Sequence, residues 1–108
     1  MYIKDGKLHF DYNFLDGVHH HLSSKILPKG KTTLKFNFIK TKPFGGTGEL
    51  FVNGKKVDTT AMPKMHISTY SLAETFGIDY GTQVDPAYGG SPFPFTGKLD
   101  RVVITLTD

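Results

Sequence analysis

The first half of the chain alternates hydrophobic with polar residues, a period of two that is typical of β-strands with one buried face. The clearest example is the run Leu-Lys-Phe-Asn-Phe at 34–38. The same alternation runs through 8–14 and 18–26, and Asp16-Gly17 between them is a turn signal. These patterns predict three strands joined by short connections.

The middle of the chain carries the strongest hairpin signal. Asn53-Gly54 separates a short strand at 49–52 from a return strand that begins at 55–57. Asn and Gly tolerate the positive φ angles that a two-residue hairpin turn requires. The preceding segment, 43–48, is rich in glycine, and we expect it to be a loop.

The second half has weaker signals. We expect a strand at 66–72, one helical turn at 73–76, a short strand at 78–80 and a turn-rich loop at 85–94. The alternation returns at 99–106, where it predicts a closing strand.

Seven or eight short strands and no sustained 3.6-residue period are typical of an antiparallel sandwich or barrel. We therefore predict an all-β fold, an antiparallel two-sheet β-sandwich of the jelly-roll or concanavalin-like kind. A length of 108 residues fits a single domain covering 1–108.

Charge and composition narrow the function. The net charge is +3, but Arg101 is the only arginine. Because nucleic-acid readers rely on arginine for bidentate contacts, we expect no nucleic-acid partner. The absence of cysteine excludes disulfides, thiolate metal sites and a Cys nucleophile in this chain. No apolar run approaches the ~20 residues that cross a bilayer, so we expect no membrane span.

Three consecutive histidines provide one candidate site. In a strand, His19 and His21 share a face, with Cα atoms about 7 Å apart. They would share a metal ion if a third ligand lay nearby, which would allow a small metal-dependent enzyme. The alternative is that His20 packs inward while the other two face solvent.

Three tyrosines provide a second candidate. Tyr70, Tyr80 and Tyr88 are suited to stacking on sugar rings, with lysines nearby for anionic groups. This pattern would suit a free-standing carbohydrate-binding module for anionic glycans. The alternative is that these rings pack in the core.

Other candidate chemistry is weak. Glu74, Asp79 and Asp85 lie in a loop region without EF-hand spacing, so turn formation or solvation explains them. The glycines at 45–48 lack the lysine and following helix of a phosphate-binding loop, and Ser91 is outside a G-x-S-x-G elbow. We expect no enzyme activity and no cofactor in this chain alone.

The hairpin region resembles a known family. The segment 46–57 reads Gly-Thr-Gly-Glu-Leu-Phe-Val-Asn-Gly-Lys-Lys-Val. It resembles the G-T-G-x-L-x-V-x-G-x-x-V hairpin in the C-terminal domain of bacterial arylsulfatases. Residues 63–72 resemble that domain's P-x-x-x-x-x-x-x-S-L segment. Residues 76–84 resemble F-D-V-G-x-D-x-G-x-x-V, although Phe76-Gly77-Ile78-Asp79 departs from D-V-G-x-D.

The resemblance continues to both ends of the chain. Residues 88–99, with Tyr88 and Pro92-Phe93-Pro94-Phe95-Thr96-Gly97, are similar to Y-x-x-P-F-x-F-T-G-x-I/L. Earlier, Tyr12-Asn13 with His20 and the segment 27–30 resemble Y-N-x-x-G-x-x-H and L-P-x-G. The ordered series covers nearly the whole chain.

This resemblance implies a β-sandwich appended to the catalytic domain of a larger bacterial hydrolase. In that family a C/S-x-P-x-R segment supplies formylglycine, and Asp and Asn hold a divalent cation. This chain has no Cys, and Arg101 does not follow S-x-P, so no catalytic residue transfers. The resemblance implies a non-catalytic C-terminal accessory domain whose partner is the sulfatase catalytic domain.

Overall fold

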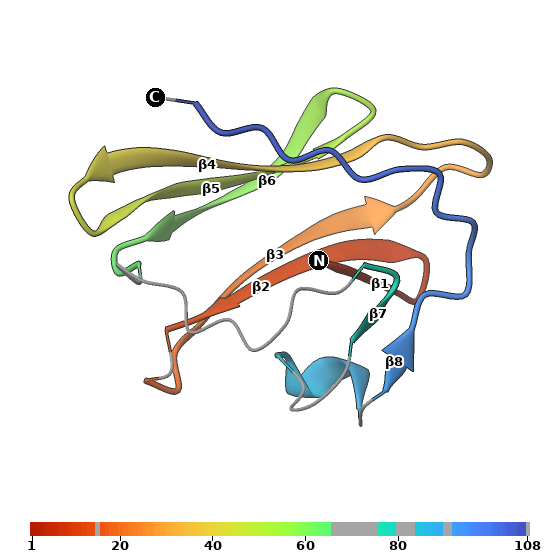
Figure 1. Cartoon of the computed structure of the whole chain (residues 1–108), viewed down its shortest axis with the longest axis horizontal. Helices are drawn as coiled ribbons and strands as arrows, with labels where there is room; N and C mark the ends of the chain where they lie inside the picture. The colour runs from red at the N-terminus through yellow and green to blue at the C-terminus, as the bar shows by residue number, and fades with distance from the viewer. Residues whose placement is uncertain (15, 66–75, 80–83, 90–91, 108) are drawn as a thin grey trace. The chain divides into compact units, whose positions relative to one another are not determined.

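The structure, a computed structural model, describes residues 1–14, 16–65, 76–79, 84–89 and 92–107. It divides into two compact units, Met1–Tyr70 and Ser71–Asp108, which we describe separately. The fold is all-β, as predicted, and the strands β1 to β8 appear in Figure 1. The expectation of a single domain over 1–108 stays a prediction.

The first sheet of the N-terminal unit contains the strands β1 (Tyr2–Lys4), β2 (Lys7–Asn13) and β3 (His19–Ile26). They are antiparallel and lie in the order β1-β2-β3. The alternation at 8–14 and 18–26 thus predicted two strands whose four ends all lie within one residue of the observed ends.

The second sheet contains β4 (Leu34–Lys42), β5 (Gly45–Val52) and β6 (Lys55–Met62), antiparallel and in that order. Asn53 and Gly54 have φ angles of 49° and 79°, which confirms the predicted hairpin turn. The two strands of this hairpin are longer than the sequence pattern indicated.

The prediction of a glycine-rich loop at 43–48 is wrong. Only Pro43 and Phe44 form the turn, and β5 begins at Gly45. The glycines are needed for close packing: a Cβ on Gly46 would collide with the backbone oxygen of Ile39. Small residues therefore mark a tight contact between strands here, instead of a loop.

The two three-stranded sheets pack face to face as a small β-sandwich, the predicted architecture (Figure 1). Leu8 and Leu22 from the first sheet and Leu50 from the second form the buried core. The rings of Phe10 and Phe36 stack across the interface, with centroids 3.5 Å apart. The inward residues come from alternate positions, as the period of two requires.

One edge of the sandwich is closed by a side chain. The Ser23 backbone N–H on β3 donates to Asp58 Oδ2 on β6, at 2.8 Å. Asp58 lies beside a β-bulge, because the pairing register shifts between Leu50 and Phe51 and leaves Val57 as the extra residue. The Asp58 carboxylate thus joins strands that belong to different sheets.

The C-terminal unit contains two short strands, β7 (Ile78–Asp79) and β8 (Phe93–Pro94), which pair antiparallel. A 3-10 helix, η1 (Pro86–Tyr88), lies between them in sequence. The Phe95 N–H donates to the Gly77 carbonyl at 2.6 Å and extends this small ladder. The predicted strand at 78–80 is therefore present at its first two residues.

The predicted strand at 99–106 is wrong in this structure. Residues 99–107 have no strand assignment, and Val103, Ile104 and Leu106 are 73%, 68% and 92% exposed. A strand needs a hydrogen-bonding neighbour, and in the described part of this unit β7 and β8 pair with each other. The predicted strand at 66–72 lies outside the described residues, as does the helical turn at 73–76 except for Phe76.

Candidate metal centre

A cluster of polar side chains projects from the first sheet, on the face away from the core. Leu8, Phe10 and Leu22 face the core, and successive residues of a strand point to opposite faces. His9 and Asp11 of β2 therefore point outward, and so do the two candidate metal ligands of β3, His19 and His21. Asp11 pairs directly with His21 in the antiparallel register.

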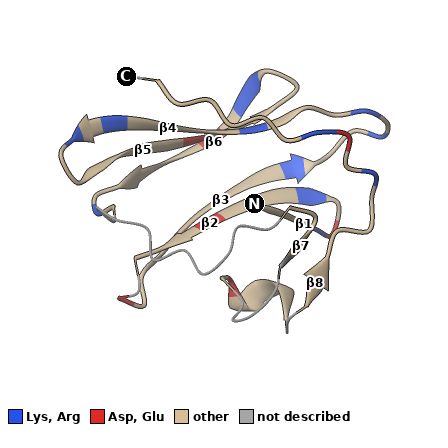
Figure 2. Cartoon of the chain, viewed as in Figure 1, with Lys and Arg blue, Asp and Glu red and all other residues tan. Residues whose placement is uncertain are grey.

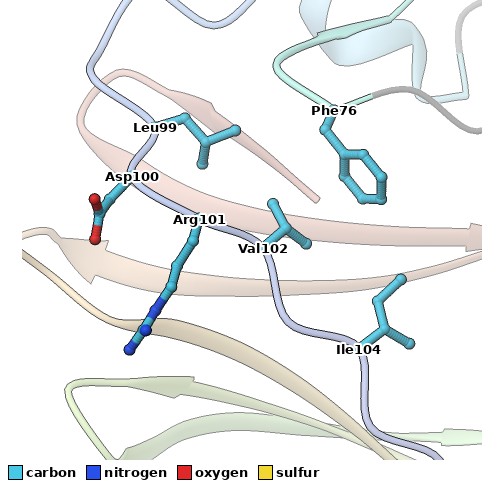
Figure 3. A pocket seen from close by; sticks show the side chains of 6 residues that line it. All are labelled: Phe76, Leu99, Asp100, Arg101, Val102 and Ile104. Carbon is cyan, nitrogen blue, oxygen red and sulfur yellow. The ribbon is translucent and has the colours of Figure 1, made fainter.

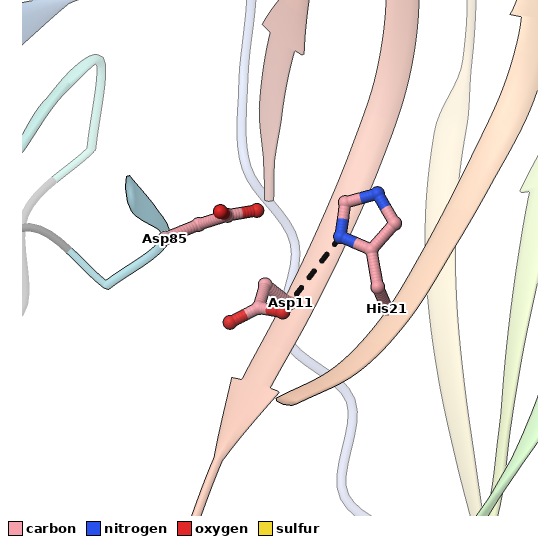
Figure 4. Close-up of side chains that lie close together, drawn as sticks. All are labelled: Asp11, His21 and Asp85. Atoms are coloured by element: carbon pink, nitrogen blue, oxygen red, sulfur yellow. Dashed lines mark ion pairs between the residues drawn. The ribbon is translucent and has the colours of Figure 1, made fainter. Parts of the chain in front are cut away.

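The carboxylate of Asp11 lies between the two imidazoles. His19 Nδ1 is 2.7 Å from Asp11 Oδ2, a short hydrogen bond. His21 Nδ1 is 3.7 Å from Asp11 Oδ1, the ion pair drawn as a dashed line in Figure 4. The side chain of Asp11 is only 2% exposed, whereas those of His19 and His21 are 34% and 39% exposed.

A third histidine holds His21 from its other side. His9 Nδ1 lies 3.1 Å from His21 Nε2, a distance at which one ring nitrogen donates and the other accepts. The ring of Tyr2 stacks on His9, with centroids 4.9 Å apart. Both nitrogens of His21 are thus near polar atoms of β2, and the ring is oriented by its neighbours.

Asp11 Oδ1 is a buried oxygen that accepts no hydrogen bond from the described residues. Leaving a buried acceptor unsatisfied costs about 1–3 kcal/mol, and more for a charged group. In native proteins, a bound ion or water molecule often satisfies a buried oxygen of this kind. Imidazole nitrogens and a carboxylate oxygen together form a ligand set that suits divalent transition metals.

Sequence reasoning found two members of the cluster and missed two. It placed His19 and His21 on one face, and the structure brings both beside the same carboxylate. It missed Asp11 and His9 because the register between neighbouring strands is not readable from the chain. The available signal was that both occupy polar positions of the alternating run at 8–14.

The alternative expectation for the histidines was that His20 packs inward. His20 is half-buried, and its ring stacks against Tyr12 with centroids 6.4 Å apart. Its two neighbours on the opposite face are partly exposed, but they also contact Asp11.

The candidate sugar-stacking tyrosines are not brought together among the described residues. Tyr70 and Tyr80 lie outside them. The Tyr88 hydroxyl accepts a hydrogen bond from the Val84 N–H at 2.8 Å, and its ring stacks on Phe93 at 4.6 Å. These contacts give Tyr88 a role inside its own loop, and a role in glycan binding stays a prediction.

Of the acidic residues expected in the C-terminal loop region, Asp79 belongs to β7 and Asp85 has a local capping role. Asp85 Oδ1 accepts from the Ala87 N–H at 2.9 Å and caps the 3-10 helix. This is the turn-forming role expected of Asp at a loop position. Glu74 lies outside the described residues.

The C-terminal unit has an open cavity of about 550 Å³ (Figure 3). Its lining combines apolar side chains with one acidic and one basic group: Phe76, Leu99, Asp100, Arg101, Val102 and Ile104. In Figure 3 the Asp100 and Arg101 side chains leave the backbone on the side away from Val102 and Ile104. The cavity is thus bordered chiefly by hydrocarbon.

The basic residues do not gather on a single element. Figure 2 shows Lys and Arg on several strands and turns of the N-terminal unit and along the last part of the chain. No helix in the described part of the chain has the length and apolar character to cross a membrane.

Comparison of the chain with family models, with curated proteins and with solved structures finds no match. The resemblance to the sulfatase C-terminal domain therefore stays a prediction that depends on the ordered motifs alone.

Proposed function

We propose that this chain is a non-catalytic accessory domain of a sulfate-ester hydrolase of the arylsulfatase kind. In this role it packs on the catalytic domain, stabilises it and shapes the rim of the substrate cleft. The main support for the proposal is that the segment 46–57, which matches the family motif, forms the β5–β6 hairpin.

Four residues of this chain that match specified letters of that motif occupy positions with a steric role. Gly46 and Gly48 lie where a Cβ would meet the neighbouring strands. Leu50 is fully buried in the core, and Gly54 has the positive φ of the turn. The motif therefore describes a folding unit and no catalytic group, which supports a structural role for the chain.

Exposed apolar side chains support a docking role. In the C-terminal unit, Val103, Ile104 and Leu106 are largely exposed, and Ile104 and Leu106 have the every-second-residue spacing of one face of a strand. A segment with this pattern and no strand partner among the described residues is suited to pairing with another protein surface. In the proposed parent enzyme, the catalytic domain supplies that surface.

The chemistry of sulfate-ester hydrolysis is assigned to the catalytic domain. The formylglycine precursor of the family requires Cys or Ser in C/S-x-P-x-R, and the chain contains neither a Cys nor that segment. The purified chain should therefore not hydrolyse p-nitrophenyl sulfate, with or without added Ca²⁺. Turnover above the uncatalysed rate would contradict the non-catalytic role.

The same preparation tests the glycan-binding alternative. The accessory-domain proposal predicts no binding to sulfated or neutral oligosaccharides at millimolar concentration, measured by titration calorimetry. Saturable binding to a sulfated oligosaccharide, lost in Tyr88→Ala, would instead support a carbohydrate-binding module.

A further inference from the structure

We propose that the outer face of the β1–β3 sheet binds a zinc-type transition-metal ion through Asp11 Oδ1 and His21 Nδ1. His19 and His9 position these two ligands without contacting the ion. The proposal depends on the geometry within the N-terminal unit, and it is independent of the accessory role proposed above.

The spacing of the two ligand atoms favours a metal ion over a hydrogen bond. His21 Nδ1 and Asp11 Oδ1 are 3.7 Å apart, too far for a hydrogen bond. Two ligands about 2.0–2.1 Å from a tetrahedral zinc ion lie about 3.3 Å apart. A shift of about 0.4 Å would therefore bring the pair to zinc-binding distance, and Figure 4 shows the two groups facing each other.

The unsatisfied oxygen of Asp11 is the second observation that points to a ligand. Asp11 Oδ2 already accepts from His19, while the buried Oδ1 accepts no hydrogen bond within the described part of the chain. If His21 were protonated, its Nδ1–H would still be too distant to satisfy Oδ1. A cation between the two groups would satisfy the oxygen and use the lone pair of the neutral imidazole.

The surrounding contacts match the support that metal ligands ordinarily receive. When His21 ligates through Nδ1, its proton is on Nε2, and His9 Nδ1 at 3.1 Å accepts it. The stacked Tyr2 ring orients His9 in turn. The 2.7 Å bond from His19 holds Asp11 so that Oδ1 points toward His21. Each ligand therefore has a partner that helps to set its direction.

The donor set also defines which ion fits. Ca²⁺ and Mg²⁺ prefer shells made of oxygen atoms, whereas an imidazole nitrogen with a carboxylate oxygen suits Zn²⁺, Cu²⁺ and Ni²⁺. With two protein ligands, water molecules would complete the shell. The site should consequently bind Zn²⁺ reversibly and discriminate against Ca²⁺.

The test is titration of the untagged, chelator-treated chain with Zn²⁺, followed by calorimetry and by the amide NMR signals of β2 and β3. The proposal predicts one saturable Zn²⁺ site whose largest shifts lie around residues 11 and 21, and no such response to Ca²⁺.

Three variants test the roles of the histidines: one changes a ligand, one changes a positioning residue and one is a control. His21→Gln should weaken Zn²⁺ binding at least tenfold, and His9→Gln should weaken it about tenfold through lost orientation. His20→Gln is the matched control: it removes a histidine from the opposite face of the same strand and should leave the affinity unchanged. Because His21 is partly exposed, His21→Gln should fold even if Asp11→Asn does not.

Two results would overturn the proposal. One is a wild-type chain that shows no Zn²⁺ binding up to millimolar concentration. The other is equal affinity in the wild type and His21→Gln, which would place the ion at other side chains.

Discussion

Two segments of this chain have the same alternating pattern and different structures. Residues 34–38 lie within β4 and pair with β5 along their whole length. Residues 99–106 alternate in the same way, yet the structure assigns them no strand. The comparison teaches that a period of two selects which side chains share a face, while a neighbouring strand decides whether a ladder forms.

The connections of the two segments explain the difference. A short turn at Pro43-Phe44 brings β5 directly alongside β4, and the cost of closing so short a connection is small. The segment 99–106 follows β8, which is already paired with β7 over two residues. In the C-terminal unit, the described residues offer it no further ladder.

The largest expected difference in the free energy of unfolding comes from truncating one leucine side chain in each region. Leu50 is fully buried and Leu106 is 92% exposed. Leu50→Ala should lower the free energy of unfolding by about 2–5 kcal/mol, because it leaves a cavity in the sandwich core. Leu106→Ala should change it by less than about 0.5 kcal/mol.

Urea unfolding monitored by circular dichroism measures both variants. Similar losses for Leu50→Ala and Leu106→Ala would mean that the C-terminal segment is packed as firmly as β5, which would remove the basis of the comparison.

A smaller effect should follow from opening the edge of the sandwich. Asp58→Ala removes the acceptor of the Ser23 N–H and should cost about 1–3 kcal/mol, since that donor is left unpaired. Asp58→Asn keeps an acceptor oxygen and should recover part of the loss. If thermal unfolding showed no difference between Asp58→Ala and wild type, the bond would not contribute to holding β3 beside β6.

The smallest effect concerns a surface ion pair of the second sheet. A hydrogen bond from Lys56 lowers the pKa of Glu49 from its ordinary value of 4.5, and Asn37 adds a second bond. Because the folded-state pKa is the lower one, the contribution to stability is present above about pH 4.5 and disappears as the pH falls through the folded value.

The measurement compares melting temperatures of wild type and Glu49→Gln between pH 6 and pH 3. The wild type should be slightly more stable at pH 6, and its advantage should decrease as the pH falls toward 3. A difference that grew on acidification would contradict the direction of the pKa shift.

Much of the fold was predictable because local signals and pairing agree in the N-terminal unit. The alternation identified β2, β3 and β4, and Asn53-Gly54 identified the hairpin. The prediction of a loop at 43–48 was wrong because glycine has two structural roles. It permits turns, and it also allows strands to approach closely, as at Gly46.

The candidate site was predictable only in part for a related reason. His19 and His21 lie on one strand, so their common face follows from the period of two. Asp11 comes from the neighbouring strand, and its position opposite His21 depends on the register of β2 against β3. Register is set by turns and by the packing of the whole sheet, which a single strand pattern does not contain.

The central claim, that this chain is an accessory domain of a sulfate-ester hydrolase, is tested most directly by the native gene product. An antibody raised against the chain would locate that product in extracts of the source cells, and its mass would be read by gel electrophoresis and mass spectrometry. The account predicts a protein several times heavier than 12.0 kDa, with sulfate-ester hydrolysis in the same chromatographic fraction. A product of 12.0 kDa without that activity would contradict it.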